Sequence, residues 1–361
     1  MTKINLYLAR HYCFNVLSFT LIVLSIIYLF DVLEILRRLN DDETNLGHVM
    51  MMGLFKLPEV GQIILPFAVL FSAIFTFWQL NRRQELVVLR STGLSVWQFL
   101  KPIGLVAVFI GVLQILIINP FGAFLLTQYE DMEQKYLSRT DNLVATLKEG
   151  LWLRQNRGEG EVIIYSQKIN PENWTFENVT FYNFDRDTDF AGRIDAPEAR
   201  LTKKGWLFPE AVIHERRQNA TAVKDYLSPT DLTPEDVENS FASPETRSFW
   251  EIPGLIAHLR EAGFDTTRLR IHFHSLLAIP VLFLAMVCVA ASIALKPSQR
   301  SGGTLRMIIT GIFTGFLIFF MMNFLKAMGA SGQLPVLMAA WSPACIVLLF
   351  GLGFLLQTED G

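Results

Sequence analysis

Long runs of hydrophobic residues occupy both ends of the chain, and polar residues gather in its middle. A helix needs about 20 predominantly apolar residues to cross the roughly 30 Å hydrocarbon core of a bilayer. Such runs lie on both sides of a more polar stretch over 127–271. The segment ahead of the first run, 1–11, carries Lys3 and Arg10 and is predicted to form a short interfacial helix. The pattern predicts six transmembrane helices, three before and three after the polar stretch, at residues 12–36, 49–80, 102–126, 272–295, 305–325 and 334–357.

Positive charges in the short segments beside these spans indicate the orientation, because Lys and Arg collect on the cytoplasmic side. With a cytoplasmic N-terminus, the outer short segments hold only Arg37, Arg38 and Lys326 near the spans. Both termini are therefore predicted to be cytoplasmic, and the polar stretch to lie outside. The cytoplasmic segments would hold Lys3, Arg10, Arg82, Arg83, Arg90, Lys101, Lys296, Arg300 and Arg306.

The polar stretch over 127–271 has the periodicity of β-strands. Segments of strand length alternate or run apolar, and turn signals such as Asn170-Pro171 separate them at intervals of roughly ten residues. An amphipathic helix over 249–263, ended by Gly263, follows them. We therefore predict a membrane α-helical protein of domains 1–126, 127–271 and 272–361, whose middle domain is an antiparallel β jelly roll or sandwich. Its predicted strands cover 161–169, 175–184, 190–202 and 206–215.

Composition agrees with a membrane protein and limits the chemistry. Hydrophobic residues make up 51% of the chain and charged residues 18%, whereas a soluble domain carries about a quarter charged residues. The net charge of −3 gives no indication of nucleic-acid binding. Cys13, Cys288 and Cys345 all lie in apolar runs, so no disulfide framework is expected.

No sequence motif for catalysis stands out. The chain lacks a P-loop and the H-E-x-x-H, G-x-S-x-G and C-x-x-C patterns. His272-x-His274 comes nearest to a metal pair, but residues two apart do not share a helix face. We interpret these histidines as an interfacial cluster, and we predict no catalytic residue and no metal site.

The loop between the second and third spans carries the most informative pattern. Residues 84–92 read as a short amphipathic helix, ended by Gly93 in a left-handed cap, within a loop helix assigned to 84–94. One interpretation is a helix lying on the lipid interface. The other is a helix laid into the groove of a soluble partner, with Glu85 pairing with a basic residue there. Its apolar residues, more than a solvated turn should expose, are Leu86, Val87, Val88 and Leu89.

The run QELVVLRSTGLS at 84–95 closely resembles the coupling-helix motif of the lipopolysaccharide-export permeases, the LptF/LptG (YjgP/YjgQ) family. The resemblance covers essentially the whole chain, including Leu-Pro-Glu at 57–59, Leu-Pro at 65–66 and Phe-Trp-Glu-Ile-Pro at 249–253. The last of these elements looks more like the LptG branch than the LptF branch.

This resemblance implies a role inside a larger complex. Such a permease pairs with its sister LptF around a central cavity, two copies of the cytoplasmic ATPase LptB bind the coupling helices, and LptC inserts a helix beside them. Lipopolysaccharide is drawn from the outer leaflet of the bacterial inner membrane and passes through periplasmic jelly rolls towards the bridge protein LptA. ATP and Mg²⁺ would be bound by the ATPase, so no cofactor and no intrinsic ATPase activity are expected in this chain. The contacts implied for the ATPase are Glu85, Leu86, Val88, Leu89, Arg90 and Gly93.

Basic residues at the outer ends of the spans are candidate contacts for the phosphates of lipid A. They are Arg37, Arg38, Lys56 and Lys326. Arg37 and Arg38 match the family in position, although Lys is expected there. The alternative is that these residues snorkel to phospholipid headgroups or pair with nearby acids.

Three acidic residues could pair with these bases at the outer rim of the cavity: Asp31, Glu34 and Glu59. The acids at 41–43 are further candidates. Lys56 and Glu59 are three residues apart on one helical face, so a mutual pair is expected. The cavity itself should be apolar, because it must hold acyl chains.

Other functions remain open. An ABC permease for lipoproteins or phospholipids would differ in the lipid that co-purifies, although many have four spans with the outer domain after the first. A non-transporting scaffold for periplasmic assembly would bring down no ATPase. An intramembrane enzyme is disfavoured because no span carries paired catalytic side chains near its midplane.

Overall fold

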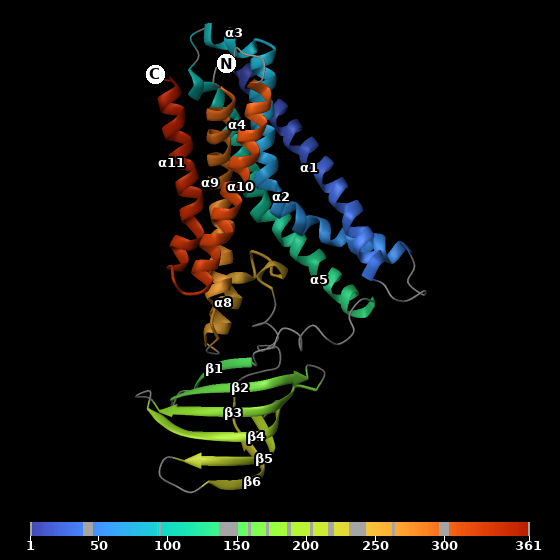
Figure 1. The fold of residues 1–361 in the computed structure, drawn as a ribbon, viewed down its shortest axis with the longest axis vertical. Coiled ribbons are helices and arrows are strands. Elements are labelled where there is room, and N and C mark those ends of the chain that lie inside the picture. The colour runs from blue at the N-terminus through green and yellow to red at the C-terminus, as the bar shows by residue number, and fades with distance from the viewer. Residues whose placement is uncertain are drawn as a thin grey trace. The chain divides into compact units, whose positions relative to one another are not determined.

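The computed structural model describes residues 2–38, 46–91, 93, 95–136, 151–157, 160–170, 173–185, 189–202, 205–215, 220–230, 243–261, 264–295 and 303–359. The chain divides into two compact units (Figure 1). The first, the membrane unit, comprises Met1–Asp131, Pro244–Ile252 and Thr267–Gly361. The second, the sheet unit, comprises Met132–Ser243 and Pro253–Thr266.

Long helices build the membrane unit. Its first half contains α1 (Thr2–Arg38), α2 (Leu46–Arg82), α3 (Glu85–Ser91), α4 (Val96–Leu113), the π-helical segment η1 (Gln114–Ile118) and α5 (Asn119–Tyr136), which ends just beyond the unit. Its second half contains the short η2 (Pro244–Thr246), then α9 (Thr267–Ala294), α10 (Gly303–Ala330) and α11 (Val336–Glu359). Within the described residues, six helical segments are long and apolar enough to cross a membrane, with α4, η1 and α5 forming one of them. The predicted three-plus-three arrangement of spans is confirmed.

The first helix differs from its prediction. It runs without interruption from Thr2, so the residues before Tyr12 continue the first helix rather than forming a separate one. Leu8, Tyr12 and Val16 recur at intervals of four, which places them on one helical face, and all three are buried in the helical core. The Tyr12 hydroxyl also donates to the Val69 carbonyl of α2 at 3.2 Å. Leu8 therefore ties this segment to the same helical core as the rest of α1.

Helix α9 supplies much of the buried core of the membrane unit. Its second half is rich in small residues, and Ala285, Ala290 and Ala291 are fully buried. Small side chains let neighbouring helices approach closely in a membrane, where apolar packing replaces the hydrophobic effect. A Cβ on Gly351 of α11 would meet the Cβ of Cys288 at 3.0 Å, which shows how near the two backbones lie.

The sheet unit contains six described strands, β1 (Leu151–Arg157), β2 (Gly160–Asn170), β3 (Thr175–Asp185), β4 (Phe190–Thr202), β5 (Gly205–Glu215) and β6 (Thr221–Ser228). They form one antiparallel sheet in chain order, so the predicted antiparallel domain between the third and fourth spans is confirmed. The described strands are joined as a meander, in which each strand pairs with the next, rather than as two packed sheets. The predicted amphipathic helix is α8 (Ile252–Glu261).

Bends across neighbouring strands let this single sheet enclose a core. The alternation of buried and exposed residues slips by one at Gln167 in β2, Asn178 in β3 and Pro197 in β4. Asn178 has a φ of 50°, in the left-handed region. Because the slips are adjacent, apolar side chains continue on one face beyond the bend. Trp206 is fully buried there, with its ring centroid 4.7 Å from that of Phe176.

Candidate functional site

Two parts of the membrane unit hold the residues that the sequence singles out. One is the end that carries α3, here called the α3 end, where both chain termini also lie (Figure 1). The other is the insert end, where the chain leaves the unit after Asp131, returns for Pro244–Ile252 and returns again at Thr267. The two ends differ in how their polar groups are paired.

Helix α3 is anchored on one face and open on the other. Gln84 adopts a left-handed φ of 58°, which turns the chain out of α2, and α3 then runs from Glu85 to Ser91. Leu86 is only 5% exposed and belongs to the helical core of the membrane unit. Val87 and Val88 are 52% and 61% exposed. The buried Leu86 therefore anchors the helix, and the two valines form its open apolar face.

The predicted left-handed cap at Gly93 is confirmed by its φ of 81°. A Cβ at this position would meet no atom within 4 Å, so the backbone conformation alone favours glycine there. Leu89 and Arg90 lie within α3, but their side chains are outside the described part of the chain. Of the residues predicted to contact an ATPase, Leu86 stands apart, because its burial makes it an anchor in this conformation.

Polar side chains connect α3 to α1. The Tyr7 hydroxyl of α1 donates to Glu85 Oε2 at 3.1 Å, and Arg83 Nη1 lies 4.0 Å from Glu85 Oε1. The Tyr7 ring stacks on that of His11, with centroids 5.9 Å apart. His11 Nε2 in turn lies 2.6 Å from Gln79 Oε1 of α2. A movement of α3 would therefore act directly on α1.

These polar contacts continue one helical turn further along α1, where it packs against α2. Asn15 Nδ2 donates to Thr76 Oγ1 at 2.8 Å, and the Ser72 hydroxyl donates to the Asn15 carbonyl at 3.1 Å. Thr76 donates to the Ser72 carbonyl at 2.7 Å. Tyr7, His11 and Asn15 are spaced by four, which places them on one face of α1. The polar stripe, defined by these three residues and their partners on α2 and α3, joins α1 to both of those helices.

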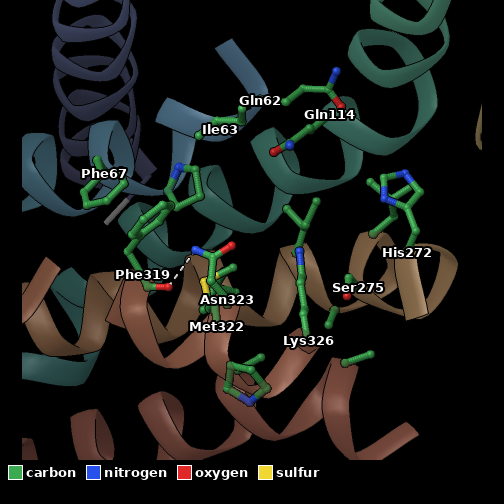
Figure 2. Close-up of a pocket in the computed structure, with 18 of the residues that line it drawn as sticks. Gln62, Ile63, Phe67, Gln114, His272, Ser275, Phe319, Met322, Asn323 and Lys326 are labelled. Carbon is green, nitrogen blue, oxygen red and sulfur yellow. Dashed lines mark hydrogen bonds between the residues drawn. The ribbon is translucent and has the colours of Figure 1, made fainter. Parts of the chain in front are cut away.

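A cavity of about 390 Å³ lies among α2, η1, α5, η2, α9, α10 and α11 (Figure 2). Towards the α3 end its wall is apolar, and towards the insert end it is polar. The apolar part includes Pro66, Phe67, Leu282, Met286, Gly315 and Phe319. The polar part includes Glu59, Gln62, Gln114, Asn119, Glu245, His272, Ser275, Asn323 and Lys326. One end of the cavity is therefore polar and the other apolar, as would suit an amphiphilic ligand.

Several polar atoms at this end of the cavity lack a partner. Gln114 is 2% exposed, and its Oε1 accepts no hydrogen bond in the described structure. The same holds for His272 Nε2 and Ser275 Oγ, which are also buried. Figure 2 draws Lys326 of α10 beside His272 and Ser275 of α9, with Gln62 and Gln114 across from them. Buried polar atoms are usually hydrogen-bonded, so these atoms favour water or a polar ligand group beside them.

Other polar groups there act as braces. Asn119 Nδ2 donates to Gln62 Oε1 at 3.1 Å, and Asn119 Oδ1 accepts from the Phe249 amide at 2.9 Å. The Phe249 ring stacks on that of Phe273, with centroids 5.3 Å apart. These contacts hold the Pro244–Ile252 segment, and with it Glu245, against the membrane helices.

The basic residues predicted at the outer rim fall into two groups. Arg37 and Arg38 pair with Glu34 on their own helix, at 3.0 Å and 2.9 Å, as the pairing alternative expects. Lys326 lines the cavity. The acids at 41–43 lie outside the described residues.

The expected pair between Lys56 and Glu59 is wrong. Lys56 Nζ instead lies 3.7 Å from Asp31 Oδ1 of α1 and 5.7 Å from the centroid of the Tyr129 ring. The long lysine reaches across to the neighbouring helices, which leaves Glu59 to line the cavity. Spacing along one helix identified a possible partner but not the nearer one on α1.

His272 lines the cavity, a position that its interpretation as part of an interfacial cluster did not predict. Gln62, Gln114, Asn119, Glu245 and Asn323 were not singled out from the sequence. Amides inside apolar runs are a usable signal, because a membrane interior penalises polar groups that have no function or partner. Among the described residues, no group of His, Cys, Asp and Glu is arranged to hold a metal ion.

Comparisons with known proteins identify similar chains. A family model described as lipopolysaccharide export system permease LptF/LptG matches residues 6–357. The lipopolysaccharide export system permease protein LptG of Escherichia coli K12 is 20% identical over 317 residues, which is 85% of each chain. The protein of the same name from Haemophilus influenzae Rd is 23% identical over 299 residues, 81% of each chain.

Proposed function

The chain belongs to the LptF/LptG family of lipopolysaccharide export system permeases, and from this premise we propose that it is the LptG-type subunit of an ATP-driven exporter. The resemblance found in the sequence is confirmed by the family match and by the LptG relatives. The chain is a multi-pass protein of the inner membrane. In the proposal, the termini and α3 face the cytoplasm, and the sheet unit lies in the periplasm.

The open face of α3 is the observation that carries the proposal. Val87 and Val88 are more than half exposed, whereas Leu86 on the same short helix is buried. An apolar helix face presented in this way suits a groove on a soluble partner. We assign that partner as the LptB ATPase dimer, which would bind ATP and Mg²⁺ and supply the work. This chain itself would have no ATPase activity.

The polar stripe supports a mechanism for using that work. Glu85 is hydrogen-bonded to Tyr7, and α1 is bonded to α2 at His11 and Asn15. Closure of the ATPase dimer would push α3, and the stripe would pass the displacement to α1 and α2 together. In the proposal these helices border the lipid cavity shared with LptF, so the displacement narrows that cavity.

Extraction needs such work because each CH₂ group moved out of a lipid environment costs about 0.8 kcal/mol. We propose that Arg37 and Arg38 receive lipid A phosphates by exchanging their bonds to Glu34. These pairs lie at the exposed end of α1, where screening makes ion pairs easy to exchange. The lipid would then pass through the sheet unit and LptC towards LptA.

The proposal is tested by replacing Glu85 with Ala or Lys in the reconstituted complex. We expect both variants to lose ATPase recruitment and lipopolysaccharide release, with Lys the more severe because it reverses the charge. Gln98→Glu is a matched control, since Gln98 is exposed at the start of the neighbouring α4. Wild-type recruitment and release in both Glu85 variants would overturn the role of α3.

A further inference from the structure

Charged residues of both signs line the cavity inside the membrane unit. Glu59, Glu245 and Lys326 all line it, and none of the three makes an ion pair within the described residues. Charged groups in a cavity between membrane helices are costly unless they are paired or hydrated. Their arrangement therefore has to be explained by what the cavity holds.

The polar end of the cavity is a built site rather than a chance gap. Gln114 is almost fully buried and keeps an unpartnered Oε1, and His272 Nε2 and Ser275 Oγ are unpartnered nearby. The segment that brings Glu245 to the cavity is held by the bond from the Phe249 amide to Asn119. Donors and acceptors thus line the same end of the cavity.

The balance of charge selects the ligand chemistry. A site for a plain anion would gather cations, but here two carboxylates, Glu59 and Glu245, accompany the single ammonium of Lys326. Lys326 suits a phosphate oxygen, and the carboxylates suit an ammonium group that donates hydrogen bonds. A headgroup with a phosphate and a primary amine satisfies both signs.

The rest of the cavity suits a hydrocarbon chain attached to that headgroup. Phe67, Leu282, Met286 and Phe319 line its other end, within the apolar depth of the spans. A volume of about 390 Å³ falls within the usual range for a ligand pocket, about 300 to 1,000 Å³. The site therefore matches the polar and apolar halves of a lipid.

We propose that this cavity binds an amine-bearing phospholipid of the phosphatidylethanolamine type, with its phosphate on Lys326, its ammonium between Glu59 and Glu245, and an acyl chain in the apolar end. The proposal goes beyond lipopolysaccharide export, because it gives a single permease subunit a lipid site of its own. It does not depend on α3 or on any partner.

The test uses the full-length chain in nanodiscs that contain equal amounts of phosphatidylethanolamine, phosphatidylcholine and phosphatidylglycerol with identical acyl chains. Native mass spectrometry after release into mild detergent reports which lipid stays bound. We expect phosphatidylethanolamine to be retained at least threefold over each of the others. Phosphatidylcholine has the phosphate but no N–H donor, and phosphatidylglycerol has no cation.

Two isosteric or near-isosteric variants separate the two halves of the headgroup. In Glu245→Gln, the ratio of retained phosphatidylethanolamine to each of the other lipids should fall close to one. In Lys326→Gln, the retention of all three lipids should fall. Arg306→Gln, on the same helix but outside the cavity lining, should match the wild type. Size-exclusion chromatography checks that each variant remains folded.

The proposal would be overturned by equal retention of the three lipids, by a preference for phosphatidylglycerol, or by no retained lipid in the wild type. An unchanged preference in Glu245→Gln would also overturn it. None of these outcomes would affect the export role, whose test measures the ATPase and lipopolysaccharide.

Discussion

The polar groups at the two ends of the membrane unit are paired to different extents. At the α3 end, Tyr7, His11 and Asn15 each have a partner on α2 or α3. At the insert end, Gln114 and His272 keep buried atoms without one. The first arrangement stabilises the contact between helices, whereas the second leaves binding capacity for another molecule. One end is therefore suited to transmit a displacement, and the other to receive a ligand.

The largest change in stability is expected at Leu86, the residue that anchors α3. Leu86→Ala removes a buried side chain from the helical core and should destabilise the protein by about 3 kcal/mol, including the cavity that it leaves. SDS titration followed by tryptophan fluorescence would measure the change. Val88→Ala is the control on the open face and should change stability by no more than about 0.5 kcal/mol. Equal losses in the two variants would contradict the assignment of one anchored face and one open face.

A second prediction concerns the polar stripe. Asn15→Leu removes the hydrogen bond to Thr76 inside the contact between α1 and α2, and should cost about 1 to 2 kcal/mol of stability. ATPase binding should persist, because Asn15 lies two turns beyond Tyr7 along α1. ATP hydrolysis and lipid release should become uncoupled, with release per ATP falling. Unchanged release per ATP would show that the stripe does not transmit the displacement.

The glycine cap of α3 gives a smaller effect. Gly93→Ala places a side chain at a φ of 81°, which should cost about 1 kcal/mol although the space around it is open. The same unfolding titration would detect the loss. Asn at this position should recover part of it, because Asn tolerates left-handed backbone. If Asn were no better than Ala, backbone strain would not be the cause.

The smallest change in stability is expected at the insert end, where a substitution can stabilise the protein instead of destabilising it. Gln114→Leu replaces a buried amide whose Oε1 has no partner, so stability in lipid-free detergent should stay within about 1 kcal/mol or rise. Asn15→Leu also replaces an amide in a membrane helix, so the stability changes of the two variants are compared directly. A loss as large as that of Asn15→Leu would mean that Gln114 is already satisfied.

Much of the fold follows from the sequence because hydropathy and strand alternation report burial directly. The cores of the six spans and four central strands were predicted, whereas β1 and β6 were not. β6 lies at the edge of the sheet, and its residues are mostly exposed or half-buried, so no clear alternation marks it. The sequence also predicted two helices where α1 is one, because the burial of Leu8 in the helical core is a tertiary contact that hydropathy does not reveal.

The candidate sites were less predictable, for a physical reason. The local pattern around Glu85 and Gly93 identified α3, since a short helix and its cap are encoded by neighbouring residues. The cavity brings together Glu59, Glu245 and Lys326 from distant parts of the chain. Spacing along one helix cannot reveal such a cluster, as the pairing of Lys56 with Asp31 illustrates.

We propose that an ATPase acts on the open face of α3 to drive lipid export. The most direct measurement is ATP-dependent release of lipopolysaccharide from the reconstituted complex, with ATPase co-purification measured on the same samples. Val88→Glu should lower both by at least tenfold, because it places a charge in an apolar contact, whereas Gln98→Glu should retain wild-type values. Wild-type recruitment and release in Val88→Glu would contradict the account.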